Sequence, residues 1–600
     1  MILAPPSSKD RHEHPTPGGN ALETHVMTAR LTRLRAAAGV RAATPCGRAL
    51  IADVAAGCRP ALLGTVLACG AAAARAQEAA VPPCDPTATI IIPERAVFGQ
   101  VRIDIGDVFD PSDPEERKRL FEFANKLHVN TRPEVISRRV LFETGDPYSV
   151  RIVEESERLL RATGYIYDPH ICVLGAHDGI VDVAVVTRDV WTLKPSISFG
   201  RSGGENEYSF GAEEDNLLGT GNAVSVEYSH DLDRDSLTFG FHNENLLGRW
   251  MTLDTSYSDN SDGHVLDLGL AQPFYALDTH RAAGIRFIDD DRIDPLYDAG
   301  EIVDEFRHEM SYQRLYWGRS PGLENGWARR WTVGLTRDFE RFSPSPEPGA
   351  TTLLPEDREL QYPFFGFELL RDHFITAKNN NQIGRTEDFY LGPRFYGELG
   401  LLSESLGSDR DGLAFSTLWS FGHEHSAFTK WLGSAQFSGR AERDEGFENA
   451  IATGSFRFYH RQSKRRLLYA SLQADVAQDL DLDNQLLLGG DNGLRGYPNR
   501  FVSGDKRVLF TIEQRLFTPW YPFRLFHVGA AAFFDVGRAW GENPFSDENP
   551  GWLKDVGIGA RFGSSRSSGG TVIHVDLAFP LDGGNDIDSV QLVIDTRHGF

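Results

Sequence analysis

The sequence predicts a mainly β protein, in which a large antiparallel β-barrel that spans a membrane follows one small α/β domain. The chain has 600 residues, more than one ordinary soluble core holds. No stretch after position 80 is apolar over the ~18 residues that a transmembrane helix needs. From position 196 to position 600, however, apolar and polar residues alternate in runs of about ten, separated by Gly/Asp/Asn-rich loops. This alternation is typical of strands that cross a bilayer, because successive strand side chains point to opposite faces.

The N-terminal part has the features of an export signal. Residues 61–74 form a short apolar run behind two arginines, and small residues follow up to Ala76. This order predicts a targeting region over 1–76 with cleavage after Ala76, then a linker over 77–95. Lipidation at Cys69 is the alternative interpretation. The true start codon stays open, because the arginine-rich segment ahead of the apolar run is unusually long.

Residues 96–195 show mixed periodicity, which predicts one small α/β domain. The expected elements are a strand near 97–105, helices over 115–128, from Pro133 and after Ser149, and strands over 166–174 and 180–187. Signal cleavage would leave two cysteines, Cys84 and Cys172, which an oxidising compartment could pair or leave as free thiols.

An internal repeat supports the hairpin topology of the remainder. The sequence Asn-Leu-Leu-Gly occurs at 216–219 and again at 245–248, and an alternating run follows each copy. A spacing near one strand pair is what an up-and-down barrel requires.

The alternation is clearest near the C-terminus. In residues 508–517 the even positions are mostly apolar, whereas Glu513 and Arg515 occupy odd positions. The same pattern in later runs assigns Phe533, Asp535, Gly537, Arg561 and Asp576 to the inner face. A soluble barrel would bury its apolar face instead, so these charges predict an inner cavity that is wet or in which the charges pair. Aromatic residues near expected strand ends suit interfacial girdles: Phe274, Tyr275, Tyr362, Phe364, Phe365, Trp520, Tyr521 and Phe523.

Several motifs resemble one family. Residues 489–497, which include Gly493, Leu494, Arg495, Gly496 and Tyr497, resemble the conserved loop motif of the BamA/TamA and two-partner-secretion transporter superfamily. The segment 533–537 is similar to that family's F-x-D-x-G strand motif, and 557–561 and 575–581 are similar to its next two strands. In the N-terminal domain, 141–148 with 155–160 and 164–166 resembles a POTRA domain.

The resemblance implies a 16-stranded barrel in the bacterial outer membrane, with a single POTRA domain in the periplasm. It also implies that the 489–497 loop folds back into the lumen, where Arg495 would meet Asp535. The exposed sheet edge of the POTRA domain could then add a strand from an extended polypeptide client. The expected function is outer-membrane protein assembly and insertion or polypeptide translocation, and the alternative is a structural or channel-forming barrel, since a fold does not fix a function.

The C-terminal segment resembles the β-signal that barrel-assembly machinery reads. Val590, Leu592 and Ile594 share the parity of the terminal Phe600, while His598 departs from the apolar preference. The family resemblance further implies a lateral seam where the first and last strands meet.

Other function classes find no support in the sequence. The net charge of -24 excludes nucleic acid as an expected partner, and the common nucleophile, phosphate-loop and metalloprotease motifs are absent, so no enzyme is expected. The cluster His423-Glu424-His425 is interpreted as polar lumen residues, and five aspartates over 289–298 as a solvated loop, so no metal or cofactor is expected. The expected partners are outer-membrane lipid and lipopolysaccharide, unfolded polypeptide clients and periplasmic or lipoprotein partners.

Overall fold

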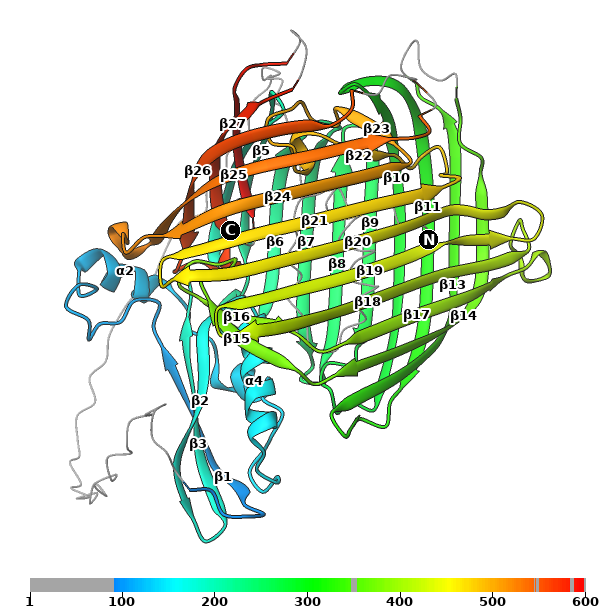
Figure 1. Ribbon diagram of the computed structural model, residues 1–600. Helices are drawn as coiled ribbons and strands as arrows, with labels where there is room; N and C mark the ends of the chain where they lie inside the picture. The colour runs from blue at the N-terminus through cyan, green and yellow to red at the C-terminus, as the bar shows by residue number, and fades with distance from the viewer. Residues whose placement is uncertain (1–90, 347–352, 544, 546–549, 583–586, 598–600) are drawn as a thin grey trace, which may run out of the picture.

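The computed structural model describes residues 91–346, 353–543, 545, 550–582 and 587–597. The predicted targeting region and most of the linker lie outside these residues, as does Phe600. The chain forms a closed antiparallel β-barrel, and a small α/β domain hangs from one end of it (Figure 1). We call the end that faces this domain the domain-side end and the opposite one the far end.

The barrel wall consists of 20 strands in chain order, with the two-residue strand β12 added at its domain-side end. The strands of the first half are β4 (Leu193–Ser202), β5 (Glu205–Glu214), β6 (Asn222–His230), β7 (Asp235–Leu246), β8 (Met251–Asn260), β9 (Gly263–Gln272), β10 (Arg281–Asp298), β11 (Glu301–Arg319), β12 (Leu323–Glu324), β13 (Trp327–Pro344) and β14 (Arg358–Arg371). Those of the second half are β17 (Arg394–Leu402), β18 (Gly412–Ser426), β19 (Thr429–Glu442), β20 (Gly446–Ser463), β21 (Arg466–Gln478), β24 (Lys506–Phe517), β25 (Phe526–Trp540), β26 (Leu553–Ser564), β27 (Val572–Pro580) and β28 (Gln591–Arg597).

The strand number corrects the prediction of a 16-stranded barrel. An even division of about 400 residues over 16 strands requires long connections throughout. Many connections are instead tight: β4 joins β5 through two residues, and so do β8 to β9 and β10 to β11. Because these connections are short, more residues are left to form strands, and the strand number is higher.

The two faces of the wall have opposite chemistry, as the alternation predicts. Ile558 on β26 is 60% exposed, whereas Arg561 on the same strand is fully buried. Exposed apolar side chains recur all round the ring, and Arg330, Arg440 and Arg515 are among the largest fully buried side chains. The barrel therefore has an apolar exterior and a charged interior, the arrangement of a wall that contacts hydrocarbon.

Three interpretations of where residues lie in the barrel are wrong. Phe274, Tyr362 and Phe364 form a buried cluster inside the barrel rather than part of a girdle, because a lumen this wide has room for apolar packing. The aspartates of 289–298 lie within strand β10 and not in a loop; Arg292 pairs with Asp290 and Asp294, which offsets their charge. The cluster 423–425 is exposed near the end of β18, beside exposed Trp419 and Phe421, and not in the lumen.

The α/β domain contains the predicted elements with shifted ends. They are β1 (Val97–Gly106), α2 (Arg119–Leu127), α3 (Pro133–Ser137), α4 (Val150–Ala162), β2 (Ile166–His177) and β3 (Ile180–Asp189). The sheet order is β1-β3-β2, with β1 parallel to β3 and β2 antiparallel to it. The core packs Phe98, Ile136 and Leu160 against valines of β3. Among the described residues, no helix is both long and apolar enough to span a membrane.

Two details of this domain bear on the sequence analysis. Helix α2 begins at Arg119, four positions after the predicted start, since turns occupy the residues before it. Cys172 on β2 is disulfide-bonded, so the alternative that it is a free thiol is wrong; Cys84 lies outside the described residues.

The Asn-Leu-Leu-Gly repeat holds the domain against the barrel. Both copies lie at domain-side turns, one after β5 and one at the end of β7. The carbonyl of Gly219 accepts a hydrogen bond from Arg132 N at 2.9 Å, and the Asn245 amide donates to Arg138 O at 3.1 Å. Arg132 and Arg138 flank the two ends of α3, so the repeat clamps this helix from both sides. At Gly219, where φ is +71°, a Cβ atom would overlap the carbonyl of Asn130, which explains the glycine.

Ion pairs complete the docking at the domain-side loops that follow β24 and β26. Glu116 of the domain pairs with Arg566 of the loop after β26, and both side chains are buried. The neighbouring Glu115 pairs with Arg524, but its side chain is 68% exposed. The two ion pairs differ in how much they stabilise the docking, because one is buried and the other is exposed. An exposed pair contributes little, whereas a broken buried pair leaves an uncompensated charge.

We predict that Glu116→Gln loosens the docking of the domain while Glu115→Gln does not. The first change leaves the Arg566 guanidinium buried without its counter-ion, at a cost on the order of 3 kcal/mol; the second costs less than about 1 kcal/mol. Hydrogen exchange of segments 107–118 and 565–571 measures the difference, with faster exchange expected in the first variant only. Equal exchange in the two variants would contradict this account.

Candidate functional site: two segments that fill the lumen

A long connection from the far end, residues 479–505, folds back into the lumen. It contains the hairpin of β22 (Leu486–Leu488) and β23 (Val502–Gly504), and the predicted motif lies between these two strands. Figure 1 shows both strands near the end of the barrel away from the domain. At Gly493 φ is +115°, and a Cβ atom would overlap Leu509 of the wall, so only glycine lets the loop approach this closely.

Arg495 at the tip of this loop reaches the inner wall. Its Nε and Nη2 donate to the two carboxylate oxygens of Asp535 at 2.8 and 3.0 Å, a bidentate pair. Its Nη1 donates to Glu513 at 2.9 Å and to Asp576 at 3.2 Å, and its guanidinium lies 3.3 Å from the ring centre of Phe533. The structure thus brings together the motif arginine and the inner-wall residues that the sequence analysis selected.

The rest of the motif holds the loop in place. Leu494 and Tyr497 are fully buried against Leu488, Val502 and Leu553. The Tyr497 hydroxyl lies 2.8 Å from the carbonyl oxygens of Lys554 and Asp582, and it accepts a hydrogen bond from Lys554 N. Gly496 N donates to Asp555 at 3.1 Å. Gly537 faces the same cluster, since a Cβ there would approach Leu488 and Leu494.

Two further arginines extend the charge cluster along the wall. Arg515 donates to Glu513 at 2.9 Å, and Arg561 pairs with Asp576 and lies 3.8 Å from Glu513. Burial alone would lower the pKa of Arg495, but the carboxylates of Asp535 and Glu513 outweigh it and raise that pKa well above its usual value. Arg495 therefore keeps its charge in this buried cluster.

The same loop contacts the rim of the far end on several sides. Arg500 forms a bidentate pair with Asp233, in the turn after β6, at 2.6 and 2.9 Å. Despite burial, Arg500 lowers the pKa of Asp233 below its usual range. Asp481 pairs with Arg440 of β19, and Asp483 pairs with Arg358 of β14. These anchors stretch the loop across the far mouth.

A second segment enters the lumen from the domain side, and the sequence analysis did not predict it. It lies between β14 and β17 and contains the hairpin of β15 (Phe374–Lys378) and β16 (Thr386–Tyr390). We call residues 374–391 the plug. Ile383, Phe389 and Leu391 pack against buried residues of β20, β21, β24, β25 and β27, namely Tyr459, Leu467, Tyr469, Phe517, Ala531 and Val572. Within the plug, Glu387 accepts hydrogen bonds from the backbone N–H groups of Asn380 and Asn381.

The α/β domain contacts the plug directly. Arg161 of α4 donates to both carboxylate oxygens of Asp388 at 2.8 and 2.9 Å. Asp168 accepts a hydrogen bond from Lys378 Nζ at 2.8 Å, and the Tyr167 hydroxyl donates to Gly384 O at 3.1 Å. The plug is therefore held between the domain and the barrel wall.

Arg515 links the plug to residues 479–505, which we call the far-end loop. Its Nη1 donates to Asn380 O at 2.8 Å, while its Nε donates to Glu513. Glu513 in turn accepts from Arg495. The result is a continuous path of hydrogen bonds from the plug through strand β24 to the loop of the opposite mouth.

The ring closes between β28 and β4, where the described residues pair over the shortest stretch. Among the described residues one register pair joins them, Ile594 with Arg201, whereas β27 and β28 share seven pairs and β4 and β5 share ten. The predicted C-terminal signal lies at this closure: Leu592 and Ile594 are in β28, and Val590 precedes it, 44% exposed. The family resemblance implied a lateral seam where these two strands meet, and this seam stays a prediction.

Comparisons with known proteins add the following. No protein-family model matches the chain, and no curated protein matches it. Among solved structures, BamA from Haemophilus ducreyi lacking POTRA domains 1-3 is similar at 13% identity and a TM-score of 0.37, covering 83% of this chain and 84% of that one. CdiB from Escherichia coli is similar at 14% identity and a TM-score of 0.43 (83% and 76% covered), and CdiB from Acinetobacter baumannii at 10% and 0.42 (84% and 73% covered). Similarity at this level of identity and TM-score does not assign a function to the chain.

We predict that Arg495→Ala leaves the strands formed but releases the far-end loop. Removing the guanidinium leaves Asp535 and Glu513 buried without this partner, at a cost of about 3 to 5 kcal/mol. Expected results are unchanged heat-modifiable mobility of the barrel, faster proteolysis within 479–505 and higher conductance in a planar bilayer. Arg443→Ala serves as the control, because the Arg443 side chain is 72% exposed at the far end. Unchanged protease protection and conductance would count against the predicted role of Arg495.

Arg515→Met should loosen both lumen segments, because Glu513 and the plug lose a shared partner. Lys430→Met is the matched variant: Lys430 lies 3.6 Å from the Phe389 ring centre of the plug, so its loss should affect the plug alone. Hydrogen exchange of 374–391 and 489–501 distinguishes the two, with about tenfold faster exchange for each ~1.4 kcal/mol of local stability lost. If Arg515→Met changed the plug but not the loop, the two segments would not be linked through Arg515.

Proposed function

We propose that this chain is an outer-membrane barrel that inserts or translocates polypeptides through a lateral seam, with its α/β domain in the periplasm acting as a POTRA domain. The apolar outer wall would contact outer-membrane lipid and lipopolysaccharide. The clients would be unfolded polypeptides, and periplasmic or lipoprotein partners would deliver them. We further propose that this work involves no chemical catalysis and no nucleic acid.

The short closure between β28 and β4 is the observation that carries the proposal. Buried, charge-paired segments enter the lumen from both ends, so a route through the wall is the alternative to one through the lumen. Among the described residues, the ladder at Ile594 and Arg201 has the fewest paired positions in the ring, so we propose that the wall separates there. Strand edges freed there could pair with a client strand whatever its side chains, because backbone groups make those bonds.

The α/β domain suits the delivery step. Its sheet order leaves one side of β2 without a neighbouring strand among the described elements, whereas residues 145–148 bond to the outer side of β1 at Phe98. An extended polypeptide could add to such an edge, and the domain already contacts the plug through Arg161 and Asp388. A client bound to the domain would therefore lie at the domain-side mouth.

A disulfide across the seam tests the proposal. Ile594→Cys with Arg201→Cys joins β28 to β4 at paired residues, whose Cα separation of about 4.5 to 5.5 Å permits a disulfide. Ile573→Cys with Thr596→Cys places an equivalent bond one ladder away, between β27 and β28, as a control. We expect only the first pair, when oxidised, to abolish complementation of a depletion strain, and reduction to restore it. Full complementation by the locked seam would refute a lateral route.

The phenotype of depletion itself separates the rival functions. Loss of many outer-membrane barrels from the outer-membrane proteome supports assembly, and loss of one secreted protein supports dedicated export. An unchanged proteome would contradict both and favour a structural or channel-forming barrel.

A further inference from the structure

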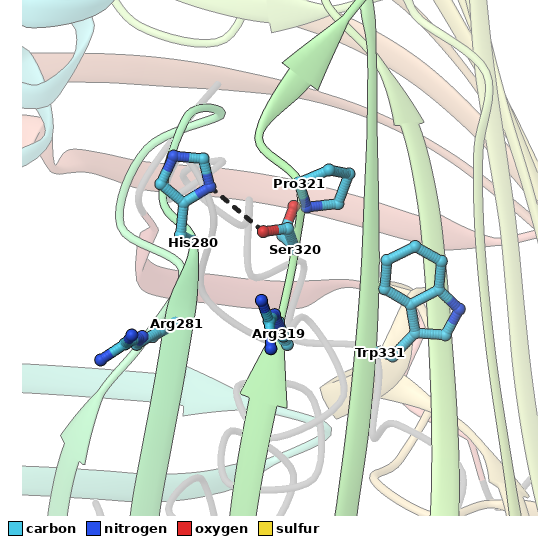
Figure 2. Close-up of a pocket in the computed structure, with 6 residues that line it drawn as sticks. All are labelled: His280, Arg281, Arg319, Ser320, Pro321 and Trp331. Atoms are coloured by element: carbon cyan, nitrogen blue, oxygen red, sulfur yellow. Dashed lines mark hydrogen bonds between the residues drawn. The ribbon is translucent and has the colours of Figure 1, made fainter.

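Two arginines stand side by side on the outer wall at its domain-side edge. Arg281 is the first residue of β10 and Arg319 the last of β11, and the two are direct cross-strand partners. Arg319 is in turn paired in register with Trp331 of β13. All three side chains are exposed, and Figure 2 shows them on three neighbouring strands.

Like charges directly opposite each other on one sheet face repel. Within the part of the chain that the structure describes, no carboxylate lies within ion-pair distance of either guanidinium, although most arginines of the barrel have such a partner. The pair is therefore a local excess of positive charge on the exterior, which an external anion would neutralise.

The neighbouring surface is apolar. The next two outward rows along the strands, each about 7 Å further on, are Ala283, Trp317, Val333 and Phe365, then Ile285, Leu315, Leu335 and Pro363. Ile285, Leu315 and Leu335 are each more than half exposed. Cations beside such rows lie where lipid phosphates meet hydrocarbon.

A shallow groove of about 600 Å³ joins these features. It is lined by His280, Arg281, Arg319, Ser320, Pro321 and Trp331. Ser320 N donates to His280 O at 3.0 Å. His280 Nδ1 also lies 3.2 Å from Ser320 O, and Figure 2 marks this second contact with a dashed line. The two contacts fix the ends of the two strands relative to each other. The two guanidinium groups are thus held on a defined part of the wall.

We propose that this groove binds one anionic phospholipid of the leaflet on the domain side. The phosphate lies between Arg281 and Arg319, whose planar N–H groups match its oxygens. The acyl chains follow Trp317 and Leu315, and the Trp331 indole lies at the headgroup level. This inference rests on the proposed membrane placement of the barrel.

The test compares lipid retention by the full-length protein in detergent. Native mass spectrometry measures the occupancy of added phosphatidylglycerol and of phosphatidylcholine. We expect about tenfold or greater preference for phosphatidylglycerol, since each cation near an anionic headgroup contributes about fivefold. Arg281→Gln with Arg319→Gln should abolish the preference. Arg337→Gln with Arg341→Gln removes the same charge from outward positions near the other end of β13 and should leave it intact.

Vesicle flotation separates this inference from the proposed function. A wild-type barrel that floats with vesicles but shows no phosphatidylglycerol preference would overturn the lipid site alone. Equal loss of the preference in the two double variants would overturn it as well. A folded barrel that does not associate with vesicles would contradict the membrane placement itself.

Discussion

A closed ring of 20 strands encloses a lumen wider than the side chains of its own wall can fill, and every charge that enters this space needs a partner. The far-end loop and the plug fill it from opposite ends. The wall supplies the counter-charges on inward positions, such as Asp535 on β25 and Glu513 on β24. The arrangement of the lumen follows from this requirement: wherever a segment crosses the interior, an arginine or a carboxylate marks its contact with the wall.

Strand parity explains why part of the site could be predicted from the sequence. A residue's face follows from its odd or even position in an alternating run, so Glu513, Arg515, Asp535, Arg561 and Asp576 could be assigned to the interior without knowledge of the fold. Family resemblance supplied the loop that meets them. The number of partners could not be predicted, because Arg495 contacts three carboxylates on three strands, and parity gives a face but no distance along the barrel.

The strand count and the plug could not be predicted, for different physical reasons. Among the described residues, strand lengths in the wall range from seven in β28 to nineteen in β11, so an average length per strand gives the wrong total. The plug has short strands and an asparagine-rich turn, a pattern equally typical of a solvated loop. Its position depends on contacts distant in sequence, such as Arg515 with Asn380, 135 positions away, and no local pattern encodes these.

The far-end loop also constrains the seam. Arg495 attaches it to β24, β25 and β27, which lie on the β28 side of the closure, whereas Arg500 attaches it to Asp233, next to β6 on the β4 side. The loop therefore bridges the two sides of the seam. Among the described residues few backbone pairs join β28 to β4, but their separation also strains the Arg500–Asp233 pair, whose loss would leave two buried charges without partners. Because Arg515 joins this loop to the plug, and Arg161 joins the plug to the domain, a displacement of the domain has a continuous bonded path to the loop that spans the seam. If this ladder opens as proposed, the side chains of the lumen, and not only the backbone pairs of the wall, determine how easily it does so.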